Sequence, residues 1–287
     1  MKRPFPLLLL FLILITGLGG CSAARDGFTE EYQLRGASRL RVITKNGSVK
    51  VTGWQENYLR LRATWMVQGE TENGLLEYGR NIKVIPDWQG DLLELTVSYP
   101  SRPPYIHSAS VSLELEVPER IEEITVETSN GALGFYNLRS ALTGRSTNGR
   151  ITVEDCEGEI DLATTNGRVI LSRLRFHGEK GRVVTTNGGI EADVMFPRTG
   201  YFLLRTTNGP VDLKLPSWTQ GTLRLETSNG RILLDQMPAA VILRSEKDLM
   251  EIRLHGGGIY LEVETSNGNI NLGESEYLYP PAPVTPI

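Results

Sequence analysis

The Asn-Gly dipeptide occurs nine times in this 287-residue chain, and eight of the nine, all except Asn73-Gly74, form one set of repeat copies. Thr or Ser stands two residues before the Asn, and an apolar residue stands three residues after it. Between the second and the seventh copy the steps are 18, 18, 21, 21 and 21 residues, which is the fixed short period of a repeat protein. The copies lie at Asn46, Asn130, Asn148, Asn166, Asn187, Asn208, Asn229 and Asn267.

Each copy is predicted to be a strand, a sharp corner and a second strand. Apolar residues alternate with polar ones on both sides of the Asn-Gly, as in Ile160 and Leu162 before Asn166 and Val169 and Leu171 after it. A period of two indicates half-buried strands. Asn-Gly suits the corner because both residues tolerate positive φ, so we expect the eight Asn residues to be structural corners.

Two architectures fit this pattern. In a hairpin meander the two strands that flank each Asn-Gly pair with each other. In a β-solenoid each strand pairs in parallel with its equivalent one rung away. Identical residues at identical positions favour stacking, so we expect an all-β fold with a β-solenoid, as a right-handed parallel β-helix, whose rungs follow chain order. The last step, from Asn229 to Asn267, is 38 residues, and we expect a degenerate copy at Lys247-Asp248 halfway along it.

The N-terminus predicts export and lipid attachment. Residues 7–15 form an apolar run behind Lys2 and Arg3, which is typical of a signal peptide and too short to span a bilayer. Leu18-Gly19-Gly20-Cys21 then resembles the bacterial lipoprotein box, in which Cys21 is acylated, with palmitate among its lipids, after cleavage before it. Ser22 after that Cys resembles the outer-membrane sorting pattern of Gram-negative lipoproteins. An ordinary signal peptide with an incidental Cys is the alternative.

The second cysteine, Cys156, then has no partner for a disulfide within the chain. It occupies a repeat position where other copies carry Leu138, Leu174, Met195 and Met237. We therefore expect a buried core thiol.

Five segments are expected from the N-terminus to the C-terminus. Residues 1–20 are the signal peptide, and 21–36 are the lipidated Cys and a tether. Residues 37–118 are a less regular β region with antiparallel strands, which holds the first Asn-Gly copy and no helix. Residues 119–273 are the solenoid repeats, and 274–287 are a Pro-rich tail. Removing Lys2 and Arg3 with the leader leaves 28 basic against 34 acidic residues, a balance that does not suggest nucleic-acid binding.

The repeated Thr-Ser/Thr-Asn-Gly-x-Ile/Val core, the run from Asn46 to Trp54 and the segment Glu114-Leu115-Glu116-Val117-Pro118 resemble the bacterial "putative adhesin" family of β-strand repeats, of the domain of unknown function 4097 type. The resemblance covers roughly residues 37–273. It implies a β-helix-like domain at the cell envelope, with some relatives linked to envelope stress and antimicrobial-peptide responses. It implies no catalytic residues.

The outward positions of the repeats are where catalytic groups would lie. Glycosidases and lyases need paired acids, or calcium with a basic residue. The column six residues after each Asn mixes signs, which predicts neutralising salt ladders rather than a catalytic pair: Glu154, Ser172, Asp193, Lys214 and Asp235, with Asp212 nearby. His107, His177 and His255 share no repeat position, so no metal site or cofactor is expected.

Seven arginines flank the corners and would form a basic stripe if the rungs stack: Arg145, Arg150, Arg168, Arg182, Arg205, Arg224 and Arg231. Such a stripe could bind an anionic envelope polymer, a glycan or a peptide. The alternative, which we favour, is pairing across rungs, since Glu127 and Glu226 stand in the same column as Arg145 and Arg205.

From the sequence we therefore expect a non-catalytic lipoprotein of the cell envelope, in the outer membrane if the host is Gram-negative. Its partner is the membrane, to which the N-terminal lipid attaches it, and its repeats serve as a binding or scaffolding surface. An envelope-stress structural component without a soluble ligand and a carbohydrate-active β-helix enzyme are the alternatives. Unpaired carboxylates would favour the enzyme, an unpaired Arg stripe the binder and fully paired columns the scaffold.

Overall fold

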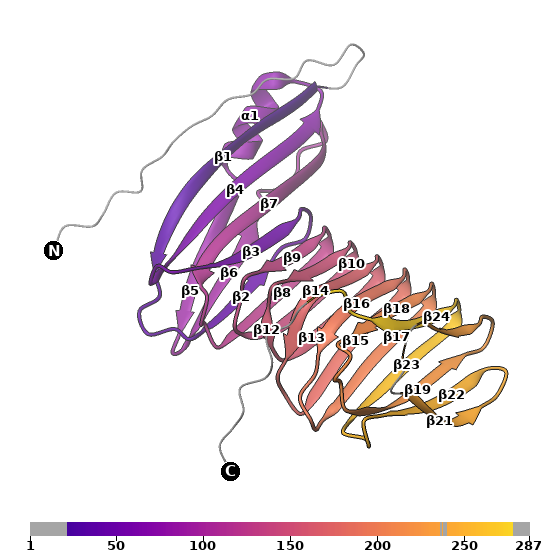
Figure 1. Cartoon of the computed structure of the whole chain (residues 1–287). Coiled ribbons are helices and arrows are strands. Elements are labelled where there is room, and N and C mark those ends of the chain that lie inside the picture. The colour runs from indigo at the N-terminus through magenta and orange to yellow at the C-terminus, as the bar shows by residue number, and fades with distance from the viewer. Residues whose placement is uncertain (1–21, 236, 238–239, 278–287) are drawn as a thin grey trace. The chain divides into compact units, whose positions relative to one another are not determined.

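The computed structural model describes residues 22–235, 237 and 240–277, which form two compact units that divide after Arg150 (Figure 1). Within these ranges the fold is all-β with one helix, and each unit contains two sheets. The predicted leader, Cys21 and the tail from residue 278 onward lie outside the described residues.

The first sheet of the first unit begins with long antiparallel strands, as the alternating runs predicted. β1 pairs antiparallel with β4, and β4 pairs antiparallel with β7. β3 then pairs in parallel with both β7 and β9. In spatial order the strands are β1 (Ser22–Gln33), β4 (Tyr58–Gly69), β7 (Ile106–Pro118), β3 (Val49–Trp54) and β9 (Leu133–Tyr136). The expected tether was wrong for residues 22–33, because all 12 residues of β1 pair with β4.

The second sheet of this unit is mixed. β2 pairs in parallel with β6 and with β8, and β8 pairs in parallel with β10, whereas β5 and β6 are antiparallel. In spatial order the strands are β5 (Lys83–Gln89), β6 (Leu92–Ser98), β2 (Arg39–Ile43), β8 (Glu123–Asn130) and β10 (Ala141–Asn148).

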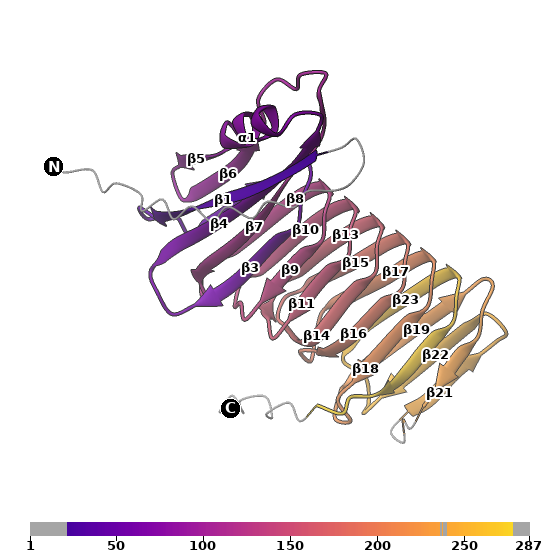
Figure 2. The ribbon, with the colours of Figure 1, turned by 90° about the horizontal axis from the view of Figure 1, so that it is seen from above.

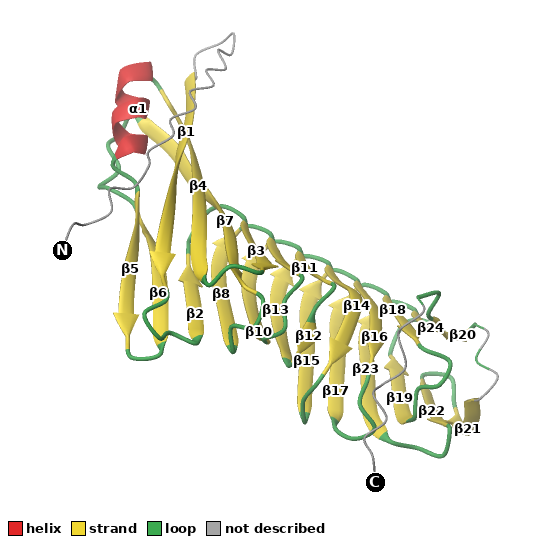
Figure 3. Ribbon diagram, turned by 60° about the vertical axis from the view of Figure 1, so that its left-hand side comes forward, coloured by secondary structure: helices red, strands yellow, loops and turns green. Residues whose placement is uncertain are grey.

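A short helix, α1 (Glu72–Arg80), contacts β1, β4 and β7 (Figure 3). The expectation that no helix follows the leader was wrong. Leu75, Tyr78 and Gly79 are its buried residues, and the Gly79 backbone lies so close to the Trp65 ring that a Cβ would come within 2.3 Å of it. The helix is thus held by packing of one face, while its exposed residues are polar.

The second unit consists mainly of parallel strands (Figure 2). One sheet contains β11 (Ile151–Glu154), β14 (Val169–Phe176), β16 (Ile190–Met195), β18 (Val211–Leu215), β24 (Ile270–Glu274) and β20 (Ile232–Leu234), with β12 (Glu157–Gly158) beside β14. The other contains β13 (Ile160–Asn166), β15 (Lys180–Asn187), β17 (Tyr201–Asn208), β23 (Ile259–Asn267), β19 (Gly221–Thr227), β22 (Leu249–Leu254) and β21 (Ala240–Ser245).

The two strands that flank an Asn-Gly lie in different sheets, so they do not pair with each other. Each pairs in parallel with its equivalent: Asn148 lies opposite Asn130, Asn187 opposite Asn166, and Asn208 opposite Asn187. The hairpin alternative is therefore wrong at these corners. The register places apolar residues over apolar residues, and Ile151, Val169, Ile190, Val211 and Ile270 are all 0% exposed.

At seven of the eight corners, all except Gly167, the glycine is required by a close backbone approach. A Cβ on Gly188 would lie 2.1 Å from the Gly167 carbonyl oxygen, and one on Gly209 would lie 2.3 Å from that of Gly188. Among the eight corners, all of them described, only Gly47 has a positive φ, and no corner Asn has one. The expectation that Asn-Gly is there to tolerate positive φ therefore holds at Gly47 alone and was wrong at the other corners, where crowding by a neighbouring backbone carbonyl is the reason for glycine, as at Gly188 and Gly209.

The Asn and Thr columns hold the corners together. Asn187 Nδ2 donates to Asn166 Oδ1, and Asn208 Nδ2 donates to Asn187 Oδ1, both at 2.8 Å. In most copies the Ser or Thr two residues before the Asn donates to the corner glycine of the neighbouring rung, as Thr206 does to the Gly188 carbonyl at 2.7 Å, whereas the buried hydroxyls of Thr44 and Thr128 make no such bond. These bonds satisfy a carbonyl that the tight corner leaves without a strand partner, which explains the constant frame of the repeat.

The rungs do not follow chain order at the end of the second unit. β23 lies between β17 and β19, and β24 lies between β18 and β20. Asn267 therefore bonds to both Asn208 and Asn229, at 2.8 and 3.0 Å. The expectation that Asn267 is the terminal corner was wrong, and Asn229 is the last member of the ladder.

The degenerate copy expected at Lys247-Asp248 was also wrong. These residues connect β21 to β22, which pair antiparallel as a hairpin, and β22 pairs antiparallel with β19. The 38-residue step thus holds a hairpin that borders the rungs rather than a rung of its own.

The first unit contains a similar exchange of order. In one sheet β2 lies between β6 and β8, and in the other β3 lies between β7 and β9. Yet β6 and β7 follow β2 and β3 in sequence. Next to Asn46, the Tyr99 hydroxyl donates to the Asn46 carbonyl at 3.0 Å. Asn130 donates to Asn46 Oδ1 from the other side at 2.8 Å.

We expect Asn187→Ala and Asn267→Ala each to lower the free energy of unfolding by about 2 kcal/mol, because each removes two amide hydrogen bonds. Asn229→Ala removes one such bond and is expected to cost about 1 kcal/mol. Urea unfolding of the three variants measures this difference. Asn57→Ala, in an exposed loop, serves as the near-neutral control. A cost at Asn267 equal to that at Asn229 would contradict the spatial order of the rungs.

Candidate functional site

The predicted arginine stripe is divided by the fold. Arg145 and Arg150 belong to the first unit, and the other five belong to the second. Two of those five, Arg168 and Arg231, follow the corner, while Arg182, Arg205 and Arg224 lie on strands of the sheet that contains β15, β17 and β19. Between Arg168 and Arg231 the same column holds Gly189, Pro210 and Asn269, so at about 4.8 Å per rung the two are about 19 Å apart. The column is not a continuous basic surface.

Most of these arginines are engaged by carboxylates. Arg168 contacts Glu191 at 2.6 Å, and Arg182 contacts Asp161 at 3.2 Å. Arg145 lies opposite Glu127 in the β8–β10 register, as the sequence predicted. Exposed Arg150 and Arg231 have no ion pair with an acidic side chain in the part of the chain that the structure describes. Pairing across rungs thus accounts for most of the column, and ion pairs at such exposure contribute little to stability.

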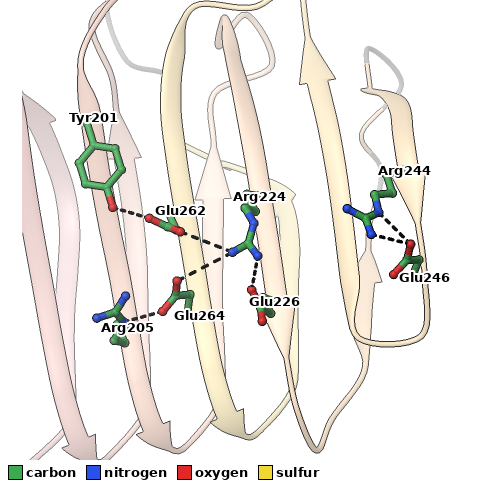
Figure 4. A network of polar contacts seen from close by, with 8 residues as sticks. All are labelled: Tyr201, Arg205, Arg224, Glu226, Arg244, Glu246, Glu262 and Glu264. Atoms are coloured by element: carbon green, nitrogen blue, oxygen red, sulfur yellow. Dashed lines mark hydrogen bonds and ion pairs between the residues drawn. The ribbon is translucent and has the colours of Figure 1, made fainter.

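The inserted strand β23 provides the densest part of this pairing (Figure 4). Glu264 contacts Arg205 of β17 at 2.5 Å and Arg224 of β19 at 3.9 Å. Glu262 contacts Arg224 at 3.5 Å. The expected neighbour of Arg205, Glu226, instead contacts Arg224 at 2.5 Å, because Glu264 lies between the two rungs. β23 therefore places two acidic residues between two arginines that chain order would have put on adjacent rungs.

A tyrosine extends this network. The Tyr201 hydroxyl donates to Glu262, and the Tyr201 and Tyr260 rings stack with centroids 6.1 Å apart. Burial and the adjacent Glu262 carboxylate raise the pKa of Tyr201 to about 12. The hydrogen bond from Tyr201, together with the nearby arginines, holds the pKa of Glu262 below its usual range. The network is therefore most stable with Glu262 ionised and Tyr201 protonated.

Because the pKa of Glu262 is lowered in the folded state, its contribution to stability is present above the unfolded pKa of about 4.3 and is lost as pH falls through the folded value. Between about pH 6 and pH 3 we expect the free energy of unfolding to fall less for Glu262→Gln than for the unmodified chain. The two decreases should differ by less than about 1 kcal/mol. Urea unfolding across this range measures the difference. Glu276→Gln, at a carboxylate that is 89% exposed, should keep the original profile. An unchanged acid limb in Glu262→Gln would contradict the assigned pairing.

The acidic column of the second unit is engaged as well. Glu154 contacts Arg173 at 2.6 Å, and the Ser275 hydroxyl donates to the two oxygens of Asp193 at 2.8 and 2.9 Å. Asp212 accepts a bond from Asn271 at 2.5 Å. Lys214 lies opposite Asp193 in the strand register. Glu154, Asp193 and Asp212 are thus neutralised or hydrogen-bonded. The expected ladder from Lys214 to Asp235 was wrong, because Gly273 of β24 lies opposite Lys214, and Lys214 contacts Glu276 at 3.9 Å instead.

The remaining chemically distinctive residues are separate from one another. Cys156 is 2% exposed, which confirms the buried thiol, and its Sγ lies 3.3 Å from the Glu154 carbonyl oxygen. His177 lies 3.1 Å from Glu157, and His255 lies 2.7 Å from the Ser217 carbonyl oxygen. Within the described ranges, no group of three or more His, Cys, Asp or Glu side chains could hold a metal ion, and no helix has the length and apolarity needed to cross a membrane.

A trough that the sequence did not predict lies on the first unit. It has a volume of about 200 Å³ and is formed by neighbouring residues of β3, β4 and β7. Two transverse rows cross it: Lys50, Glu114 and Arg62 in one, and Thr52, Glu116 and Arg60 in the other. We call it the Lys50 trough; its lining is Lys50, Thr52, Arg60, Arg62, Glu114, Leu115 and Glu116.

Arg60 is the most restrained side chain of the trough. It contacts Glu116 at 3.1 Å and Glu31 at 3.3 Å, and it donates to the Tyr58 hydroxyl at 2.9 Å. Its guanidinium also lies 4.7 Å from the centroid of the Trp54 ring. Arg62 is looser, 3.7 Å from Glu114 and 65% exposed. Lys50 lies 5.1 Å from the centroid of the Tyr136 ring and has no ion pair with an acidic side chain among the described residues.

Two kinds of comparison gave no relative: no protein-family model matches the sequence, and no curated protein matches it. Solved structures do resemble the chain. A "putative cell adhesion protein" from Clostridium sporogenes is 13% identical with a TM-score of 0.39, covering 88% of this chain and 100% of its own. A "putative adhesin" from Bacteroides fragilis is 11% identical with a TM-score of 0.43, covering 86% and 96%.

A "putative lipid binding protein" from Parabacteroides distasonis is 9% identical with a TM-score of 0.36, covering 87% of this chain and 97% of its own. These neighbours are bacterial proteins, several of them named as adhesins.

Proposed function

We propose that this chain is a non-catalytic, lipid-anchored protein of the bacterial cell envelope whose Asn-Gly repeats form a β-solenoid, in the form of a right-handed parallel β-helix. The repeats serve as a scaffolding or binding surface. The observation that carries the proposal is the pairing of outward charges across rungs, with Arg205, Glu264 and Arg224 as its centre. A face whose charges are already paired is suited to a rigid support.

The same pairing distinguishes the hypotheses drawn from the sequence. An acid/base enzyme needs carboxylates free to exchange protons, whereas Glu154, Asp193 and Asp212 are held by Arg173, Ser275 and Asn271. A polymer-binding stripe needs adjacent uncompensated cations, whereas Arg168 and Arg231 are four rungs apart. A structural component of the envelope without a soluble ligand on this face is the reading that the ladders favour.

The anchor rests on the residues Leu18 to Cys21 and the apolar run before them. Under this proposal Cys21 carries the lipid and becomes the mature N-terminus, and Ser22 directs the protein to the outer membrane in a Gram-negative host. β1 begins at Ser22, so the strand would follow the lipidated residue directly.

To test the anchor, we expect Cys21→Ser to abolish incorporation of labelled palmitate in the bacterial host, because the thiol that accepts the lipid is removed. The protein should then be recovered as uncleaved precursor or as released chain. Cys156→Ser is the matched control and should label normally, since its thiol is buried. Normal labelling of Cys21→Ser would refute lipidation at this position.

To test the surface, the full chain in detergent is applied to dextran sulfate beads over a range of salt concentrations. We expect the double variant Arg150→Glu with Arg231→Glu to be retained on the beads to the same extent as the unmodified chain. Within the described ranges only these two stripe arginines lack a carboxylate partner, and they belong to different units. Arg168→Glu, which breaks a paired site, is the comparison. Loss of salt-sensitive retention in the double variant would show that the stripe binds anionic polymer.

A further inference from the structure

We propose that the Lys50 trough is a binding site for an acidic saccharide, with the carboxylate of the sugar held by Lys50. This inference depends neither on the lipid anchor nor on the arginines of the repeats. It follows from the charges, hydrogen-bonding groups and size of the trough.

The lining carries one more cation than anions. Lys50, Arg60 and Arg62 face Glu114 and Glu116, and Arg60 is already engaged by Glu116 and by Glu31. Arg62 and Glu114 form a long ion pair at 3.7 Å, which leaves guanidinium N–H groups free to donate. Glu31, which pairs with Arg60, balances this extra cation, so the attraction for an anion is local to Lys50, the lining cation that has no carboxylate within ion-pair distance among the described residues.

The position of Lys50 is fixed by an aromatic ring rather than by an acid. Gly134 lies opposite Lys50 in the strand register, and the Tyr136 ring covers it, since a Cβ on Gly134 would meet that ring at 2.6 Å. The Lys50 ammonium lies over the same ring. A cation–π contact at an exposed site is weak, about 0.5–1 kcal/mol, so the ammonium can turn from the ring to a carboxylate at low cost.

The acceptors of the trough define the rest of the ligand. Ionised Glu114 and Glu116 can only accept hydrogen bonds, and the Thr52 hydroxyl can donate or accept. A simple anion such as phosphate offers these carboxylates only one or two P–OH donors at neutral pH, on the same small group that carries the repelling charge. A sugar acid has both parts, because its carboxylate accepts from Lys50 and Arg62 while its hydroxyls donate to the glutamates.

The size of the trough agrees with this class. A volume of about 200 Å³ is below the range of drug-sized pockets and suits one sugar ring. The trough is open to solvent on the outer face of the sheet, so further rings of an oligosaccharide can extend beyond it. The ligand class is therefore an oligosaccharide of uronic acids that places one residue in the trough.

The test is calorimetric titration of the full chain in detergent with trigalacturonate, with neutral galactotriose and with inorganic phosphate. We expect binding of trigalacturonate that weakens with salt, and no binding of the neutral sugar or of phosphate. Lys50→Gln should weaken trigalacturonate binding by about 10- to 100-fold, because a charge-assisted hydrogen bond is lost. Lys83→Gln, which removes an exposed lysine of β5, is the matched control and should bind normally.

Each other outcome overturns the assignment. Absence of trigalacturonate binding, or unchanged binding in Lys50→Gln, excludes the site. Equal binding of galactotriose would show that the charge of the sugar plays no part in binding. Equal binding of phosphate would show that the trough is a simple anion site. Arg150→Glu combined with Arg231→Glu should bind trigalacturonate normally, which separates this site from the repeat surface.

Discussion

The close approach of successive Asn-Gly corners is the constraint on which the rest of the structure depends. A corner carbonyl such as that of Gly188 lies where the Cβ of the next corner residue, Gly209, would otherwise be. The Thr206 hydroxyl bonds to that carbonyl, and the Asn208 amide bonds to Asn187. Together these contacts set the spacing and register of the rungs. Because the side-chain period of a strand is two, a fixed register also decides which residues enter the core and which form the outward ladders.

In both units a rung lies outside chain order, and in the second unit the exchanged strand changes the charge pairing. Without β23, Arg205 would face Glu226, and Arg224 would face Leu203 and keep only Glu226 of its own strand. With β23 in place, Glu262 and Glu264 lie between the two arginines. The arrangement also makes β23 an interior strand, paired with β17 on one side and β19 on the other. Release of β23 therefore requires the loss of its long-range pairing with β17. The cost is a slower folding step, since these contacts span about 60 residues.

The periodic part of the fold could be predicted from the sequence, and the features that the prediction missed were missed for physical reasons. Spacing and alternation predicted the corners, the parallel pairing and the burial of Cys156. Neither could predict the exchanged rungs, because Asn229 and Asn267 have the same local frame and only their neighbours differ. Helix α1 was missed because its nine residues hold two glycines and bury only two side chains, those of Leu75 and Tyr78. The Lys50 trough was missed because its lining comes from three strands that are distant in sequence.

This distribution of charge indicates where recognition can take place. In a repeat array, equivalent positions recur next to one another, and cross-strand pairs of opposite charge are favoured at each step. Such columns neutralise themselves, as Glu264 does for Arg205 and Arg224. The strands β4 and β7, which form the trough with β3, do not repeat, and among the described residues Lys50 remains without a carboxylate, as Arg150 and Arg231 do in the repeats. Self-neutralising columns suit a rigid support, so a ligand of negative charge would be attracted first to the cations that the pairing leaves without a partner.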